Sequence, residues 1–99
     1  MGKTDILHIL RENQHLIRSR FFVKRMGLFG SYAQGTQNPK SDIDLILEFE
    51  EGHRLGLIAM DELENFMKGI LHTDKIDLVN YKYMNPVVKS EMEKSVQYV

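Results

Sequence analysis

The sequence has 99 residues, of which 42% are hydrophobic and 27% are charged, and its formal net charge is -1. This length suits one compact domain with a modest core, and the composition excludes a disordered chain. The near-neutral charge argues against strong general binding of nucleic-acid backbones, and the lack of cysteine excludes disulfides, zinc–thiolate sites and thiol nucleophiles.

The N-terminus carries no apolar segment before a cleavage site, and no stretch is long enough to span a bilayer. We therefore expect a cytoplasmic protein without a membrane partner. The four histidines show no metal-ligand spacing, and we expect them at the surface or beside helix ends. They are His8, His15, His53 and His72.

The first part of the chain predicts a helix, a strand and a loop. Apolar residues recur near a helical period over residues 4–19, and Thr4 can cap that helix. Residues 22–29 have the mixed pattern of a strand that ends at Gly30. Residues 30–41 are rich in Gly, Ser, Asn and Pro, which predicts a loop that can hold one helical turn near residues 32–33.

The second part predicts strand, helix, strand and helix. Residues 42–50 alternate between two faces, as in a strand, and residues 55–71 form an amphipathic helix. Residues 75–79 form a short strand, and Asn85-Pro86 begins a last helix over residues 85–96. This order predicts an α/β (α+β) fold: a small mixed sheet of three or more strands flanked by helices. The apolar residues of the last helix, Val88, Met92 and Val96, would permit a dimer or a hetero-complex.

Two carboxylates lie at the start of the second predicted strand. Asp42 and Asp44 are two residues apart, so their side chains leave the same face. Neighbouring carboxylates repel each other unless a cation lies between them, and oxygen ligands suit magnesium or manganese. The alternative is that Asp42 closes a turn while Asp44 lies at an exposed strand start.

A Gly-Ser pair follows the first predicted strand directly. Gly30 would let a phosphate approach the backbone, and Ser31 adds a hydroxyl and an amide donor at the start of a short helical turn. Such dipeptides are also common in ordinary turns.

A third carboxylate, Asp77, lies within the otherwise apolar run of residues 75–79. A carboxylate in the middle of a strand is costly unless it is paired, solvated or bound to a metal. A salt bridge with Lys75 or another nearby base is the alternative explanation.

Together, the order and spacing of these residues match what phosphoryl or nucleotidyl transfer requires: a cradle for phosphates and carboxylates that hold divalent cations. The segments Gly30-Ser31-Tyr32-Ala33-Gln34-Gly35 and Ser41-Asp42-Ile43-Asp44-Leu45 resemble the signature of the minimal nucleotidyltransferases. These are small relatives of the DNA polymerase beta superfamily, often found as antitoxins beside a HEPN-domain toxin. The resemblance covers nearly the whole chain, and residues 1–99 are expected to form one such domain.

The resemblance implies a role for each matching position. Gly30 and Ser31 would hold the β- and γ-phosphates of ATP, with Gln34 and Ser41 also at the nucleotide. Asp42, Asp44 and Asp77 would be the catalytic residues and would ligate two magnesium ions, with manganese as an alternative. The family implies transfer of AMP to a hydroxyl, typically a tyrosine of a cognate HEPN toxin, which neutralises that toxin and releases pyrophosphate.

One position departs from the family pattern. Gln34 stands where the family usually carries Arg, and an amide cannot supply the charge with which Arg pairs with phosphate oxygens. Two alternatives therefore stay open: an antitoxin that inhibits its toxin by binding alone, and a nucleotidyltransferase that acts on RNA or a small molecule.

Overall fold

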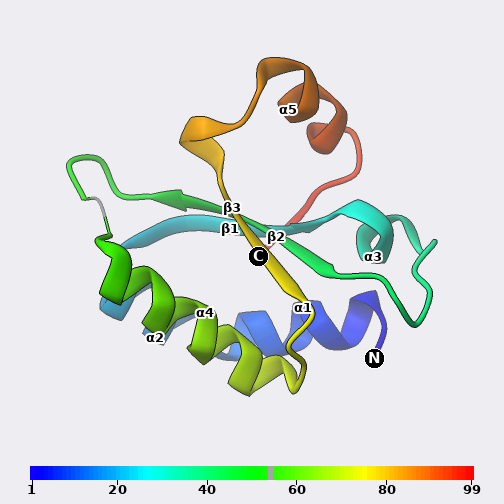
Figure 1. Ribbon diagram of the computed structural model, residues 1–99, viewed down its shortest axis with the longest axis horizontal. Helices are drawn as coiled ribbons and strands as arrows, with labels where there is room; N and C mark the ends of the chain where they lie inside the picture. The colour runs from blue at the N-terminus through cyan, green and yellow to red at the C-terminus, as the bar shows by residue number, and fades with distance from the viewer. Residues whose placement is uncertain (54) are drawn as a thin grey trace.

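The computed structural model describes residues 1–53 and 55–99, which form helices on both sides of one sheet (Figure 1). The elements follow in the order α1 (Lys3–Glu12), α2 (Gln14–Phe21), β1 (Val23–Phe29), α3 (Gly30–Gln34), β2 (Ile43–Phe49), α4 (Leu57–Leu71), β3 (Ile76–Asn80), the 3-10 helix η1 (Tyr81–Tyr83), α5 (Pro86–Glu93) and β4 (Gln97–Tyr98). This confirms the mixed α/β fold with a flanked sheet. No helix in the described part of the chain is both long and apolar enough to cross a membrane.

The sheet has the strand order β3-β2-β1-β4. β1 pairs antiparallel with β2 and β4, whereas β2 pairs parallel with β3. A parallel pair requires a crossover connection, and α4 supplies it between β2 and β3. The crossover places the N-terminal ends of β2 and β3 beside the C-terminal end of β1.

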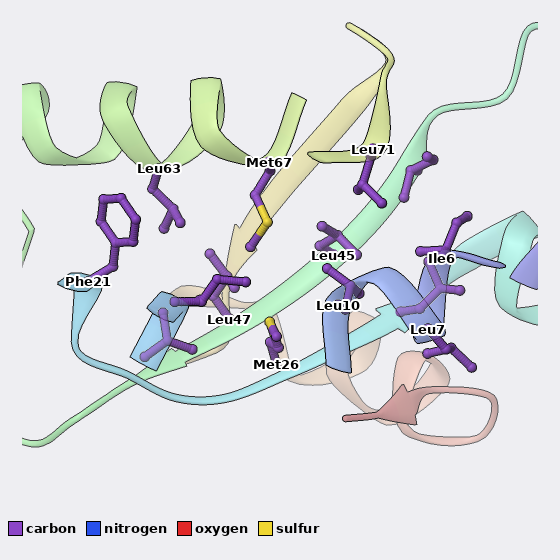
Figure 2. Close-up of a cluster of buried hydrophobic side chains, with 14 of the residues drawn as sticks. Ile6, Leu7, Leu10, Phe21, Met26, Leu45, Leu47, Leu63, Met67 and Leu71 are labelled. Carbon is purple, nitrogen blue, oxygen red and sulfur yellow. The ribbon is translucent and has the colours of Figure 1, made fainter. Parts of the chain in front are cut away.

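The main core lies between one face of the sheet and helices α1, α2 and α4 (Figure 2). Leu45 and Leu47 of β2 are buried there, as the predicted alternation requires, and Leu63 and Met67 of α4 cover them. Burial of such side chains contributes roughly 1.5–3 kcal/mol each, so this layer fixes the position of β2 under α4.

Residues 4–19 do not form the single helix that the periodicity predicts. Asn13 separates α1 from α2, and its side-chain amide donates a hydrogen bond of 2.8 Å to the carbonyl of Ile9. This local bond competes with continuation of the helix. Both helices still turn their apolar side chains toward the sheet.

The C-terminal prediction is also wrong in part. Asn85 caps α5 by accepting a 2.8 Å hydrogen bond from the N–H of Val87, as expected, but α5 ends at Glu93 rather than near residue 96. The chain then turns back, and Gln97–Tyr98 forms the edge strand β4 against β1. Val96 therefore does not belong to an apolar helix face.

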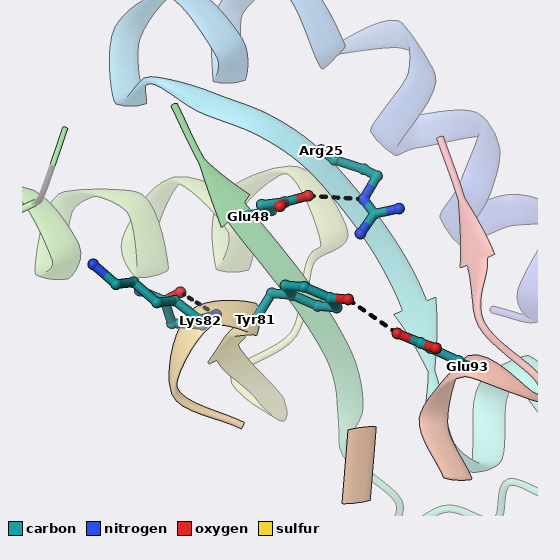
Figure 3. A network of polar contacts seen from close by, with 6 residues as sticks. Arg25, Glu48, Tyr81, Lys82 and Glu93 are labelled. Atoms are coloured by element: carbon teal, nitrogen blue, oxygen red, sulfur yellow. Dashed lines mark hydrogen bonds and ion pairs between the residues drawn. The ribbon is translucent and has the colours of Figure 1, made fainter. Parts of the chain in front are cut away.

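The second face of the sheet is covered by η1 and α5, and the chain then returns to the sheet edge as β4 (Figure 1). Arg25 of β1 lies on this side of the sheet, and its Nε is 3.0 Å from a carboxylate oxygen of Glu48 (Figure 3). Its guanidinium also lies 4.1 Å from the ring centroid of Tyr98 in β4. The Tyr81 hydroxyl donates a 3.0 Å hydrogen bond to Glu93 and so links η1 to α5. This network attaches the C-terminal segment to the sheet.

Candidate active site

The three aspartates lie at the same end of the sheet. Asp44 is the second residue of β2, and Asp42 comes directly before that strand. In the parallel register Asp44 lies opposite Asp77 of β3, and in the antiparallel register it lies opposite Phe29, the last residue of β1. Paired residues on adjacent strands send their side chains to the same face, so the carboxylates of Asp44 and Asp77 are neighbours.

Gly30 closes the other side of this cluster. Its φ of +73° lies in the region that favours glycine, and a Cβ atom at this position would lie only 3.1 Å from the Asp44 carboxyl carbon. The Asp44 side chain therefore points at the backbone of the Gly-Ser turn. The sequence analysis explains glycine at residue 30 by the close approach of a phosphate to the backbone. The approach of the Asp44 side chain is a second reason why this residue has to be glycine.

The electrostatics of the cluster follow from this crowding. Burial, followed by the negative charges of Asp77 and Asp42, raises the pKa of the Asp44 carboxyl above its usual range. Asp42 and Asp77 are exposed, while Asp44 is half-buried. The cluster thus concentrates negative charge around one carboxylate, an arrangement that a cation would relieve.

The carboxylate oxygens are the ligand type that Mg²⁺ or Mn²⁺ takes. Within residues 1–53 and 55–99, no three carboxylate or imidazole side chains already converge closely enough to hold a metal ion. Asp42 and Asp77 would therefore have to turn toward Asp44, and their exposure leaves them room to do so. The donor set and its repulsion fit a divalent cation.

Ser31 and Gln34 lie on α3, which begins directly at Gly30. The first turn of a helix leaves backbone N–H groups without intrahelical acceptors, and these groups favour an anion. Ser31 is half-buried beside Gly30, whereas Gln34 is exposed in the last turn of α3. The predicted helical turn near residues 32–33 thus exists and starts two residues earlier.

The loop between α3 and β2 is held by two side chains. The Ser41 hydroxyl accepts a 2.9 Å hydrogen bond from the N–H of Asn38, which closes the turn before Asp42. The ammonium of Lys75 donates a 2.7 Å hydrogen bond to the carbonyl of Pro39. Lys75 therefore anchors the loop to the start of β3, and among the described residues Asp77 has no ion pair within 4.0 Å.

Lys75 was missed as a positioning residue because its bond joins residues that are 36 positions apart. The sequence offered Lys75 only as an ion-pair partner for Asp77.

The histidines lie at the surface or beside helix ends, as predicted. His8 pairs with Glu12, the ring centroids of His53 and Phe22 are 4.1 Å apart, and His72 directly follows α4.

Two hollows border the sheet. The larger, about 740 Å³, lies at the opposite end of the strands, with Glu48, Asn80 and Tyr81 on its wall, and the lining described for it includes none of the motif residues. A smaller groove of 310 Å³ lies between α4 and β3, and Asp77 is one of its lining residues. Of these two hollows, the smaller groove adjoins the acidic cluster through Asp77.

Comparison with known proteins identifies the family of the chain. The model of the nucleotidyltransferase domain family matches residues 6–99. Protein adenylyltransferase MntA of Thermococcus cleftensis is 32% identical over 95 residues, which is 96% of this chain and 93% of that protein.

Two solved structures are also similar. One, provisionally described as a minimal nucleotidyltransferase, is 27% identical with a TM-score of 0.77 over 98% of this chain and 95% of that chain. The other, a toxin–antitoxin with AMP-PNP, is 28% identical with a TM-score of 0.66 over 99% of this chain and 72% of that chain. With the family model matching almost the entire sequence, this chain belongs to the nucleotidyltransferase domain family.

Proposed function

We propose that this chain is an antitoxin that transfers AMP from ATP to a hydroxyl, most simply a tyrosine, of a cognate HEPN-domain toxin in the cytoplasm. The observation that carries the proposal is the crowding of Asp44 between Gly30 and Asp77, which joins a phosphate-binding turn to an acidic cluster. The relative named protein adenylyltransferase and the toxin–antitoxin structure with AMP-PNP support the reaction and the partner class.

In the proposed reaction, the acceptor oxygen forms a bond to the α-phosphorus of ATP while the bond from that phosphorus to the bridging oxygen breaks. The hydroxyl proton passes to Asp77, and pyrophosphate leaves with the bonding electrons. Backbone groups of Gly30 and Ser31 hold the phosphates that depart, because the start of α3 favours anions. The Ser41 turn sets the direction in which Asp42 enters the site.

Asp42, Asp44 and Asp77 would hold magnesium ions. When bound, the metal would neutralise charge on the phosphates and stabilise the attacking and leaving oxygens. The raised pKa of Asp44 supports this assignment. A cation would offset both the loss of hydration that burial causes and the repulsion from Asp77 and Asp42.

Gln34 supports a second candidate function, inhibition of the toxin by binding alone. Its side chain is exposed on α3 and neutral, so it adds no charge to the phosphate side of the site. The ammonium of Lys3 lies 3.5 Å from the carbonyl of Ala33, the residue before Gln34. This proximity favours the catalytic candidate, because Lys3 can supply part of the missing charge.

Co-expression with a candidate HEPN-domain toxin separates the two candidates. Growth is the first readout, and the mass of the purified partner is the second. A catalytic antitoxin adds AMP to the partner, and Asp42→Asn/Asp44→Asn/Asp77→Asn abolishes both the added mass and the protection of growth. If the triple variant protects growth as well as the wild type does, the binding-only function is correct.

A further inference from the structure

We infer that the groove between α4 and the free edge of β3 is the docking surface for the acceptor protein, and that it takes a segment with apolar and basic side chains beside the acceptor hydroxyl. This inference rests on the proposed function. It adds where the acceptor lies and which chemistry selects it.

The direction of approach follows from the order of the strands. The Gly30 turn lies at the end of β1, Asp44 lies on the central neighbour β2, and Asp77 lies on β3. The attacking and leaving oxygens of a phosphoryl-type transfer are roughly in line on opposite sides of phosphorus. If pyrophosphate leaves toward β1, the acceptor hydroxyl has to arrive from the side of β3.

That side of the molecule carries an apolar surface. Leu57 and Ile58, in the first turn of α4, are 92% and 79% exposed and are the two most exposed large hydrophobic side chains among the described residues. Leu57 also lines the 310 Å³ groove, together with Met60, Ile76 and Leu78. Apolar side chains that line such a groove favour contact with another apolar surface.

The charged side chains of the groove indicate the charge of the segment that binds there. All three of its charged lining residues are acidic: Asp61, Glu64 and Asp77. Glu64 is partly compensated by Lys68 at 3.2 Å, and Asp61 accepts only a hydrogen bond of 3.3 Å from the Asn65 amide. The surface therefore complements an acceptor with a basic residue near its hydroxyl.

The position of β3 completes the argument. It is an edge strand, so one side of its backbone has no neighbouring strand in the sheet. An extended segment can pair with such an edge while its side chains enter adjacent pockets. Ile76 and Leu78 face the core under α4, whereas the Asp77 side chain leaves the opposite face of β3 together with Asp44. A segment on this edge would therefore send a long hydroxyl-bearing side chain around β3 to reach Asp77.

The test measures transfer of labelled AMP from ATP to the HEPN-domain toxin that the wild-type chain neutralises, at varied acceptor concentrations. We expect Leu57→Ser/Ile58→Ser to raise the KM for the acceptor at least about tenfold, because exposed anchors at the centre of an interface contribute most of its affinity. Asp61→Lys should also raise the KM for the acceptor. Affinity for ATP and the melting temperature should not change, since these side chains are exposed.

Val87→Ser/Val88→Ser is the matched control, because these residues of α5 are also exposed (73% and 52%) and lie outside the groove. It should leave the KM for the acceptor unchanged. An unchanged KM in Leu57→Ser/Ile58→Ser, with wild-type labelling intact, would overturn the docking surface. A complete absence of labelling by the wild type would instead overturn the proposed function.

Discussion

The carboxylate of Asp44 points at the backbone of Gly30, in the space that a side chain at residue 30 would fill. Two consequences follow from this contact. The Gly30-Ser31 turn and the acidic cluster form one unit, because Asp44 reaches the turn from the neighbouring strand. In addition, residue 30 must be glycine for a conformational and a steric reason at once.

Gly30→Ala should lower the free energy of unfolding by more than Gly35→Ala does. Both glycines have positive φ, +73° and +75°, and a side chain in that region costs about 1–2 kcal/mol. Only at Gly30 does the new methyl group meet another residue, which adds about 1–3 kcal/mol of overpacking. Urea unfolding of both variants measures the difference, and equal losses would show that Asp44 does not approach Gly30.

Asp44→Asn should stabilise the metal-free protein at neutral pH. The pKa of the Asp44 carboxyl is raised in the folded state, so the fold favours the protonated carboxyl over the ionised one. The stability that the protonated carboxyl contributes is complete below the unfolded pKa of 3.8 and is lost as the pH rises through the folded pKa. The amide removes this dependence. Thermal melts in a chelator across pH 3 to 7 measure it; a variant with the same pH profile as the wild type would contradict the crowded cluster.

Leu63→Ala should cost about 2–5 kcal/mol of unfolding free energy, because Leu63 is fully buried between α4 and the sheet. Leu57→Ala, on the same helix but 92% exposed, should change it by less than about 0.5 kcal/mol. Chemical denaturation of the two variants is the measurement. Similar losses would mean that α4 packs on the sheet through a different face.

Lys75→Met should loosen the loop before Asp42 by removing the hydrogen bond to Pro39, a loss of about 0.5–1.5 kcal/mol. Amide hydrogen exchange should accelerate over residues 36–41. Lys82→Met serves as control, since its exposed side chain lies on η1 at the other end of the strands. Equal exchange over residues 36–41 in both variants would remove Lys75 from its anchoring role.

Local pattern predicted the strands and the long helix well, since each has a clear apolar period. It missed the break at Asn13 because α1 and α2 both present apolar side chains to the same layer. It also missed β4, whose two residues are too few to show alternation and pair with β1 only after the chain turns back. Ile46 shares its face of β2 with Asp44 and Glu48 and is nevertheless buried.

The spacing of Asp42 and Asp44 predicts that both side chains leave the same face, but the pair alone fits a turn and a strand start equally well. The place of Asp77 beside Asp44 depends on the parallel register of β2 and β3, which no local pattern contains. The roles of Gly30, Ser31, Gln34 and Ser41 toward a nucleotide come from family resemblance and stay predictions.

The most direct test of the central claim is a labelling experiment with α-labelled ATP, magnesium and the HEPN-domain partner. Asp42→Asn and Asp44→Asn should each reduce the rate of AMP transfer at least about a hundredfold, since the metal supplies several kcal/mol to the transition state. Asp74→Asn, which changes an exposed carboxylate outside the cluster, should transfer at the wild-type rate. Transfer at the wild-type rate by both Asp42→Asn and Asp44→Asn would contradict the assignment of this site.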